Sequence, residues 1–304
     1  MKNRKLYYFA LIPCLIGIVL GSFFDYTINN AIYSPNNGFG IFMSAFAPIL
    51  GYAILAILCG LFHRAAIKEE TMWLKIVFFL LSIGGMIPTI LISAGHVTSV
   101  NAYNCPEYKW LWIIIEIVIY CGFFVLGDFF GKSNTSKPIL WASLVFAGLV
   151  IIDLVPVGQI IKNLVRRPRF RICVDNSYGI QVSFINWWEP GNELYNSLVP
   201  TYESIIPSFS EHFKSFPSGH TGVAAILIFG LPFLSNIVPK LKDKENLLFA
   251  IGMAYTVLMG FSRMLIGAHY LSDVSFGALI NIICMIIANE INLKFFLKEE
   301  NVVD

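Results

Sequence analysis

The sequence predicts an all-α integral membrane protein with about eight transmembrane helices, and three observations support this. Hydrophobic residues make up 57% of the 304-residue chain and charged residues only 13%, whereas a soluble domain is about one-quarter charged. The mean hydropathy is +0.70. Apolar stretches long enough to cross a bilayer recur along the chain. This composition excludes an ordinary cytosolic enzyme, a disordered protein and a nucleic-acid-binding protein, and it implies contact with membrane lipids.

The first half of the chain contains four apolar runs of the length that a helix needs to cross the hydrocarbon core. They cover residues 6–24, 41–62, 73–95 and 110–130, and the last of them carries Glu116 and Asp128 near its ends. The first run follows a basic N-terminus, as in a secretory signal. It is longer than the apolar part of such a signal and no small-residue cleavage site follows, so we expect an uncleaved span.

The second half contributes four more runs, at residues 138–161, 221–239, 247–261 and 271–291. The fifth span contains Asp153, and a carboxylate at that depth is either functional or a partner for a polar group inside the bundle, which we favour. Residues 170–216 form the only long stretch outside the predicted spans. A connection of that length is usually functional.

Lysine and arginine placement predicts the orientation of the spans, because cytoplasmic loops carry an excess of both. With both termini in the cytoplasm of a cell-membrane protein, most basic loop residues fall on the cytoplasmic side. The exception is the predicted outer region 162–220. It carries six basic residues, namely Lys162, Arg166, Arg167, Arg169, Arg171 and Lys214. Such a dense exception indicates an anionic ligand at the outer face.

Three polar clusters lie at the outer ends of the predicted spans. The first runs from Lys162 to Arg169, directly after the fifth span. The second is the tetrapeptide Pro-Ser-Gly-His at 217–220, directly before the sixth. The third lies between the seventh and eighth spans and reads Ser262-Arg263, five residues, His269, three residues, Asp273.

These clusters contain the groups that phosphoryl transfer needs. Lys162, Arg169 and Arg263 are cations able to hold phosphate oxygens. Ser218 and Gly219 are expected to open a helix whose first amides face an anion.

Histidine and carboxylate side chains supply the proton chemistry of the predicted site. His269 and Asp273 are four residues apart, so on a helix they would share a face, where the carboxylate can orient the imidazole. His220 is available as a second proton-transfer group.

Together the clusters resemble the signature of the type 2 phosphatidic acid phosphatase (PAP2) superfamily, which reads K-x6-R-P, then P-S-G-H, then S-R-x5-H-x3-D. The second and third parts match in full. In the first part Phe170 stands where the family has proline, and Arg167-Pro168 looks like the first half of the bacterial R-P-R-P version. The resemblance covers residues 162–273. It implies a catalytic helical bundle of the PAP2/haloperoxidase type in residues 138–304, preceded by spans in residues 1–137 that carry no recognised motif.

The resemblance also implies roles for individual residues. His269 would be the nucleophile that forms a phosphohistidine, Asp273 would orient it, and His220 would exchange the proton with the leaving group and with water. Lys162, Arg169, Ser218, Gly219 and Arg263 would bind phosphate, with no metal and no other cofactor. The implied function is a metal-independent membrane phosphatase acting on a lipid phosphate at the outer face.

Several alternatives stay open at this point. The substrate could be undecaprenyl pyrophosphate or another polyprenyl pyrophosphate, or the enzyme could be a lipid phosphotransferase. A non-enzymatic transporter with intramembrane carboxylates would make the three motifs accidental. A metal site could form from His212, His220, His269 and Asp273.

Two further expectations concern the outer segments. Cys105 and Cys173 are the only predicted outer cysteines and could form a disulfide. The stretch 170–216 is rich in Trp, Tyr and Phe, which we expect at the membrane interface beside a lipid substrate, unless they pack the loop on itself.

Overall fold

The computed structural model describes residues 4–99, 109–153, 158–175, 179–206 and 208–297, and all the regular elements in these ranges are helical. The first five helices are α1 (Lys5–Ile32), α2 (Gly38–Phe46), α3 (Pro48–Lys68), α4 (Met72–Ser99) and α5 (Lys109–Phe130). The next four are α6 (Lys137–Ile152), α7 (Gly158–Val165), α8 (Phe170–Val174) and α9 (Asn192–Tyr202). The last three are α10 (Gly219–Phe233), α11 (Glu245–Leu265) and α12 (Leu271–Phe295).

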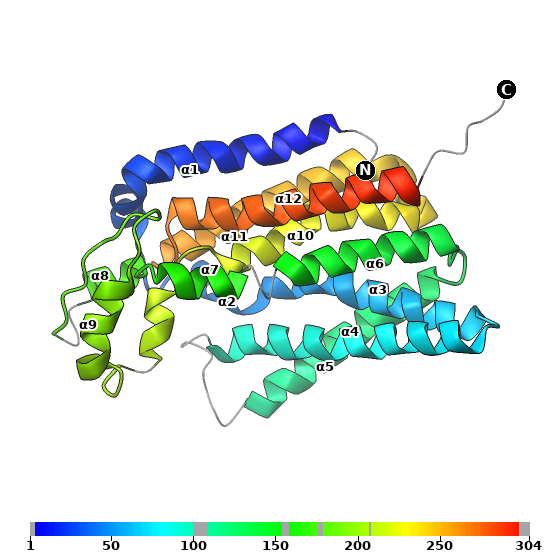
Figure 1. The fold of residues 1–304 in the computed structure, drawn as a ribbon, viewed down its shortest axis with the longest axis horizontal. Helices are drawn as coiled ribbons and strands as arrows, with labels where there is room; N and C mark the ends of the chain where they lie inside the picture. The colour runs from blue at the N-terminus through cyan, green and yellow to red at the C-terminus, as the bar shows by residue number, and fades with distance from the viewer. Residues whose placement is uncertain (1–3, 100–108, 154–157, 176–178, 207, 298–304) are drawn as a thin grey trace.

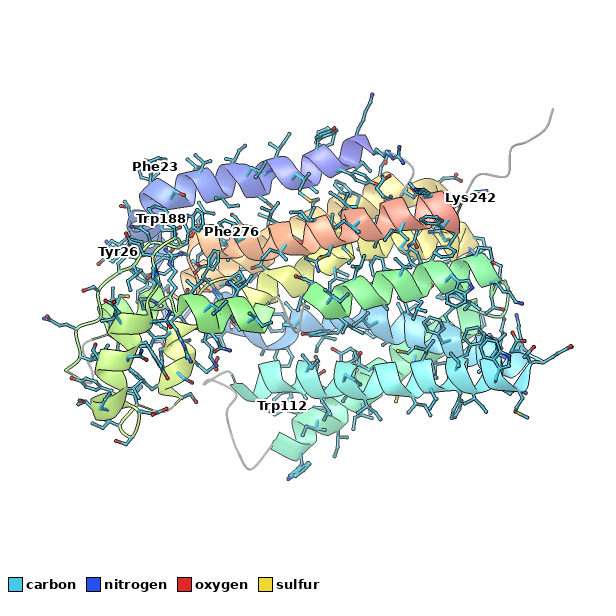
Figure 2. All side chains as sticks on the ribbon, viewed as in Figure 1. Phe23, Tyr26, Trp112, Trp188, Lys242 and Phe276 are labelled. Atoms are coloured by element: carbon cyan, nitrogen blue, oxygen red, sulfur yellow. The ribbon has the colours of Figure 1, made fainter. Side chains whose placement is uncertain are left out.

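The helices form an elongated bundle whose centre is α3 and α10 (Figure 1). α10 packs against α3, α11 and α12, whereas α4 and α5 pack on α3, and α1 packs on α12. Side chains of α3 and α10 are mostly buried, but α1, α4 and α5 expose most of theirs. The exposed ones are large and apolar, such as Phe9 and Phe23 on α1, and Figure 2 shows Phe23 on the outer side of that helix. An apolar surface of this extent fits lipid rather than water.

The prediction of an all-α membrane protein with about eight spans is confirmed. Seven helical segments of the described residues are long and apolar enough to cross a membrane. The eighth predicted span, 138–161, contains α6, which ends at Ile152 and is shorter than the other seven. α7 begins at Gly158 and carries Lys162, and residues 154–157 between the two lie outside the described ranges.

A break in the second predicted span also shapes the bundle. α2 and α3 meet at Ala47, and Pro48 occupies the first turn of α3, where its missing N–H removes no helical hydrogen bond. α2 packs against α11 and α4. This places Ser44 of α2 beside the third motif cluster.

Residues 170–216 fold into a small cap with its own apolar core. α8, α9 and the 3-10 helix η4 (Phe209–Phe213) surround Ile172, Ile180, Val182, Ile206, Phe209 and Phe213. Rings of Tyr195 and Tyr202 pack on Phe209. Trp188 is the exposed aromatic residue of this segment among the described residues, at 51%. Phe209 and Phe213 thus pack the cap on itself, whereas the placement of the other aromatic residues at the membrane interface stays a prediction.

The cap and the motif clusters lie at one end of the bundle. Figure 2 shows Trp188 and Tyr26 at this end and Lys242 at the opposite end. Lys242 belongs to the 3-10 helix η6 (Pro239–Lys244), which precedes α11.

Candidate active site

The structure brings the three motif clusters together where α10 and α12 begin. The main-chain N–H of Ser218 donates to the main-chain oxygen of Asp273 at 3.0 Å, which joins the second cluster to the third. Nζ of Lys162 lies over Gly219, since a Cβ placed on that glycine would be 3.2 Å from it. Residues that are far apart in the sequence therefore meet at the starts of α10 and α12. Their chemical roles stay predictions.

His269 lies in the turn between α11 and α12 and is buried, with 1% of the residue exposed. Gly267 gives the turn a positive φ of 63°, a conformation that glycine adopts without steric cost. Nδ1 of His269 is 2.6 Å from the main-chain oxygen of Ser215. A carbonyl oxygen only accepts, so Nδ1 carries the proton. In the neutral imidazole, Nε2 then carries the lone pair.

The electrostatic surroundings keep His269 neutral. Burial lowers its pKa well below the usual range, and the charges of Arg169, Arg263 and Lys162 lower it further. All three predicted phosphate-binding cations are thus close enough to act on this ring. A neutral imidazole with three cations close to it is suited to attack a phosphate held by them.

Asp273 is close to His269 but does not bond to it directly. The expected shared helix face is wrong, because α12 begins at Leu271 and Asp273 belongs to its capping box with Tyr270. The Oδ2 atom of Asp273 is 3.9 Å from His269 Nδ1 and accepts from Oγ of Ser215 at 2.5 Å. Asp273 therefore holds the ring through Ser215, whose oxygen the imidazole binds.

The three cations differ in how they are held. Burial, with Arg169 and Arg263 nearby, lowers the pKa of Lys162 to about 8. Nε of Arg169 donates to the main-chain oxygen of Glu211 at 2.8 Å. Nη1 of Arg263 donates to Oγ of Ser44, while its Nε is buried without a hydrogen-bond partner among the described residues. A buried unpaired donor costs free energy that an anionic ligand would recover.

The start of α10 fits the predicted anion site only in part. Oγ of Ser218 caps the helix by accepting from the N–H of Thr221 at 3.4 Å. The amide of Ser218 is bonded to Asp273, so the expectation that it faces an anion is wrong. The amide of Gly219, over which Nζ of Lys162 lies, is the donor of this turn that fits the prediction.

His220 follows on the same turn of α10. Its Nε2 is 3.1 Å from the main-chain oxygen of Ser44, and since that oxygen accepts, Nε2 carries a proton. Nδ1 is then the ring nitrogen that can gain or lose a proton while this contact is kept. The same Ser44 holds Arg263 through its hydroxyl, so α2 connects the two motif residues.

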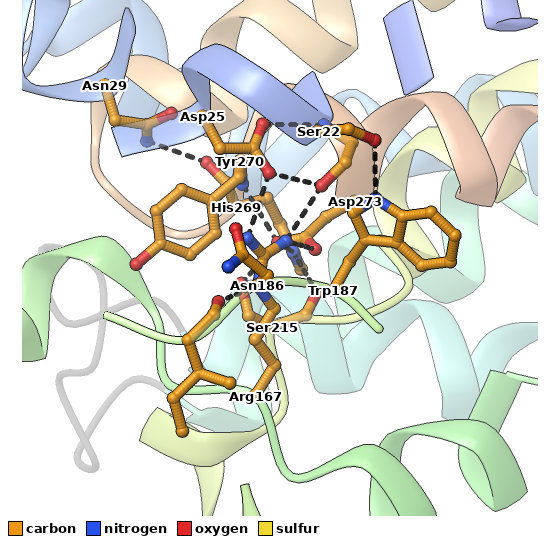
Figure 3. A network of polar contacts seen from close by, with 12 residues as sticks. Ser22, Asp25, Asn29, Arg167, Asn186, Trp187, Ser215, His269, Tyr270 and Asp273 are labelled. Atoms are coloured by element: carbon orange, nitrogen blue, oxygen red, sulfur yellow. Dashed lines mark hydrogen bonds and ion pairs between the residues drawn. The ribbon is translucent and has the colours of Figure 1, made fainter. Parts of the chain in front are cut away.

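Sequence reasoning missed the role of Arg167 and two partners on α1. Arg167 is fully buried and its guanidinium joins Asp25 at 2.9 Å to Asp273 at 2.6 Å (Figure 3). Asn29 of α1 donates to the main-chain oxygen of His269 at 2.9 Å. Only the Arg167-Pro168 pair pointed to this arginine. Asp25 and Asn29 belong to no motif, and their proximity depends on how α1 packs on α12.

Phe170, which replaces the family's proline, occupies the first position of α8. Proline is favoured at that position of a helix, so the exchange keeps the backbone geometry. The phenylalanine ring is fully buried between Tyr26 and Tyr33 at the end of α1 and Tyr270. Its ring therefore packs the end of α1 against the turn that contains His269 and Tyr270.

The structure also bears on Asp153, on the alternative of a metal site and on the two outer cysteines. Asp153 is buried and accepts from the amide of Asn281 at 2.8 Å, which confirms its interpretation as a partner inside the bundle. Among the described residues no three His, Cys, Asp or Glu side chains are grouped as a metal site, so the metal-site alternative has no donor set there. Cys105 lies outside the described residues. The Sγ of Cys173 is 3.7 Å from the hydroxyl of Tyr270.

Comparison with known proteins gives one match. The profile of the PAP2 superfamily matches residues 138–296, which is 159 of the 304 residues and extends from α6 through α12. No curated protein and no solved structure matches the chain. The matched region contains all three clusters described above. On this evidence the chain belongs to the PAP2 superfamily and is a multi-helix membrane protein of the phosphatase type.

Proposed function

We propose that this protein hydrolyses a lipid phosphate or pyrophosphate through a phosphohistidine on His269. The observation that supports this most strongly is the state of that ring. It is buried and neutral, its Nδ1–H is bonded to Ser215, and it lies among Lys162, Arg169 and Arg263. An imidazole in a structural role would not need three cations around it.

The first half of the reaction forms the covalent intermediate. The lone pair on Nε2 of His269 attacks phosphorus as the bond from phosphorus to the leaving oxygen breaks. His220, in its protonated form, gives a proton to that oxygen, which leaves as an alcohol or a monophosphate. The cations and the amide of Gly219 bind the remaining oxygens as charge shifts onto them.

The second half releases phosphate and restores the enzyme. His220, now neutral, takes a proton from a water molecule, whose oxygen attacks phosphorus. The N–P bond breaks and its electron pair returns to Nε2 of His269. Asp273, acting through Ser215, stabilises the positive charge that the imidazole carries while it is phosphorylated.

A lipid substrate is supported by where the site lies. The motif residues are at the ends of apolar helices whose outer surfaces carry exposed Phe, Leu, Ile and Val side chains. A phosphate pocket at that level is near lipid headgroups, so a lipid can present its phosphate while its chains stay in hydrocarbon. We propose a cell-membrane location with both termini in the cytoplasm and the site outside, on the distribution of basic residues. A lipid phosphotransferase would use the same site.

The test is a phosphatase assay of the purified protein in detergent with EDTA present. We expect phosphate release from a long-chain phosphatidate or a polyprenyl pyrophosphate, with inhibition by vanadate, because the cations can hold a five-coordinate phosphate mimic. Short-chain phosphatidate and glucose 6-phosphate should give a lower kcat/KM. A strict need for added magnesium or zinc would contradict the mechanism. Equal or higher efficiency on the sugar phosphate would contradict the lipid substrate.

We expect activity to fall at alkaline pH because of Lys162. Its pKa in the folded protein is lowered to about 8, so the free enzyme loses this positive charge as the pH rises through that value. Because kcat/KM reports the free enzyme, it should fall above about pH 8. The Lys162→Arg variant keeps its charge and should move the fall to higher pH. An unchanged alkaline limb in that variant would show that another group titrates.

A further inference from the structure

We propose that Asp25 and Asn29 of α1 are positioning residues of the phosphatase site, so that α1 is part of the catalytic unit. Both residues lie outside the region that matches the family, which begins at residue 138. The proposal rests on the function proposed above. It assigns to the first membrane span a role in the reaction in addition to anchoring.

The first observation is a buried group of three charges. Arg167 bridges the carboxylates of Asp25 and Asp273, and all three side chains are at most 1% exposed (Figure 3). Taking charges out of water is expensive, and apolar residues of similar size often stabilise a fold equally well. A buried triad is thus a poor way to hold α1 on α12 for stability alone, and its contact with Asp273 indicates another role.

The second observation is that α1 holds the segment 269–273 at both ends. Asp25 accepts from the main-chain N–H of Ser272 at 3.0 Å and also from its hydroxyl. Asn29 donates to the main-chain oxygen of His269. Asp25 and Asn29 are four residues apart on α1 and so lie on the same face. One face of one helix therefore fixes the main chain on either side of Tyr270.

The third observation concerns charge. Arg167 alone would neutralise Asp273 and weaken its effect on the imidazole. Asp25 takes the second nitrogen of the guanidinium, so the triad keeps a net charge of −1 beside the ring that becomes positive in the intermediate. Through Asp273 and Ser215 this charge acts on Nδ1 of His269. Removing the charge of Asp25 should raise the barrier to attack.

The decisive experiment measures single turnovers of the full-length protein in detergent, with enzyme in saturating excess over ³²P-labelled phosphatidate. For Asp25→Asn we expect the limiting rate constant to fall about 10- to 100-fold, the size of effect that a misplaced reacting group produces. For Asn29→Ala we expect a smaller fall, which still decides the matter if Asp25→Asn does not fold. The Ki for vanadate should change less than about threefold, because the cations stay in place.

Two matched controls separate positioning from folding. Asp128→Asn removes a half-buried carboxylate paired with Arg64 between α3 and α5, and Asn292→Ala removes a buried amide that donates to the main-chain oxygen of Ala142. Both changes resemble the test variants but lie away from the site, so neither should alter the limiting rate constant. A purely structural defect inactivates a fraction of the molecules and leaves that rate constant unchanged in the remainder.

The experiment distinguishes a failure of the positioning role from a failure of the proposed function. Wild-type rate constants in both Asp25→Asn and Asn29→Ala would overturn this inference and leave the proposed function standing. Equal losses in the test and control variants would also overturn it. A wild-type protein that is inactive on every phosphate substrate would overturn the proposed function, and the positioning role with it.

Discussion

Replacing His269 with alanine is expected to remove activity while leaving the protein folded. His269 is the ring whose pKa all three predicted phosphate-binding cations lower, and alanine removes the Nε2 lone pair that would form the covalent intermediate. The structural cost includes the unpaired main-chain oxygen of Ser215, about 1–3 kcal/mol, and the space that the buried ring leaves. Steady-state assays and size-exclusion chromatography of the purified variant would measure both effects.

A second histidine provides the control for this change. His63 on α3 is partly exposed and bonds to Asp128, away from the motif clusters. His63→Ala should keep activity close to that of the wild type. If His269→Ala retained more than a few per cent of wild-type activity, the assignment of the nucleophile would be wrong.

Replacing Arg167 with methionine is expected to cause the largest loss of stability. The side chain is fully buried, and its removal leaves the carboxylates of Asp25 and Asp273 together in the interior without a cation. Breaking a buried ion pair in this way costs about 3–5 kcal/mol. Thermal unfolding in detergent should show a large fall in Tm, and activity should be lost as Asp273 moves.

Arg64→Met is the matched control, because Arg64 pairs with Asp128 where both side chains are partly exposed. Because water reaches this pair and not the triad, removing Arg64 leaves a carboxylate that can still be solvated, so the Tm should fall less. The double variant with Asp25→Asn should recover part of the loss in Arg167→Met, since one of the two unpaired charges is removed. Equal Tm values for Arg167→Met and Arg64→Met would contradict the assignment of a buried triad.

The parts of the fold that the sequence predicts are those set by local composition. Apolar runs of bilayer length identify most spans because a lipid-facing helix has to be apolar along its whole length. The end of α6 at Ile152 was not predictable in this way, because the single carboxylate that follows it, Asp153, does not exclude a longer span. The motif clusters were found because their residues lie at span ends.

The parts of the site that were missed depend on packing. Asp25 is 142 residues from Arg167, and no local sequence pattern indicates that α1 brings the two side chains together. The predicted helix face shared by His269 and Asp273 failed because the helix begins two residues after the histidine. Aromatic residues of the cap were placed at the membrane interface from their type alone, yet Phe209 and Phe213 form the core of that cap.

The central claim is that His269 becomes phosphorylated, and one measurement tests it directly. The purified protein is mixed with ³²P-labelled substrate, quenched in alkali and digested, and the labelled peptide is identified by mass spectrometry. The mechanism predicts alkali-stable, acid-labile label on His269 and none in His269→Ala. With a substrate whose leaving group needs no proton, it also predicts more label in His220→Ala, because water attack there lacks its base. Label on another residue, or none in an active wild-type protein or in His220→Ala with such a substrate, would contradict the account.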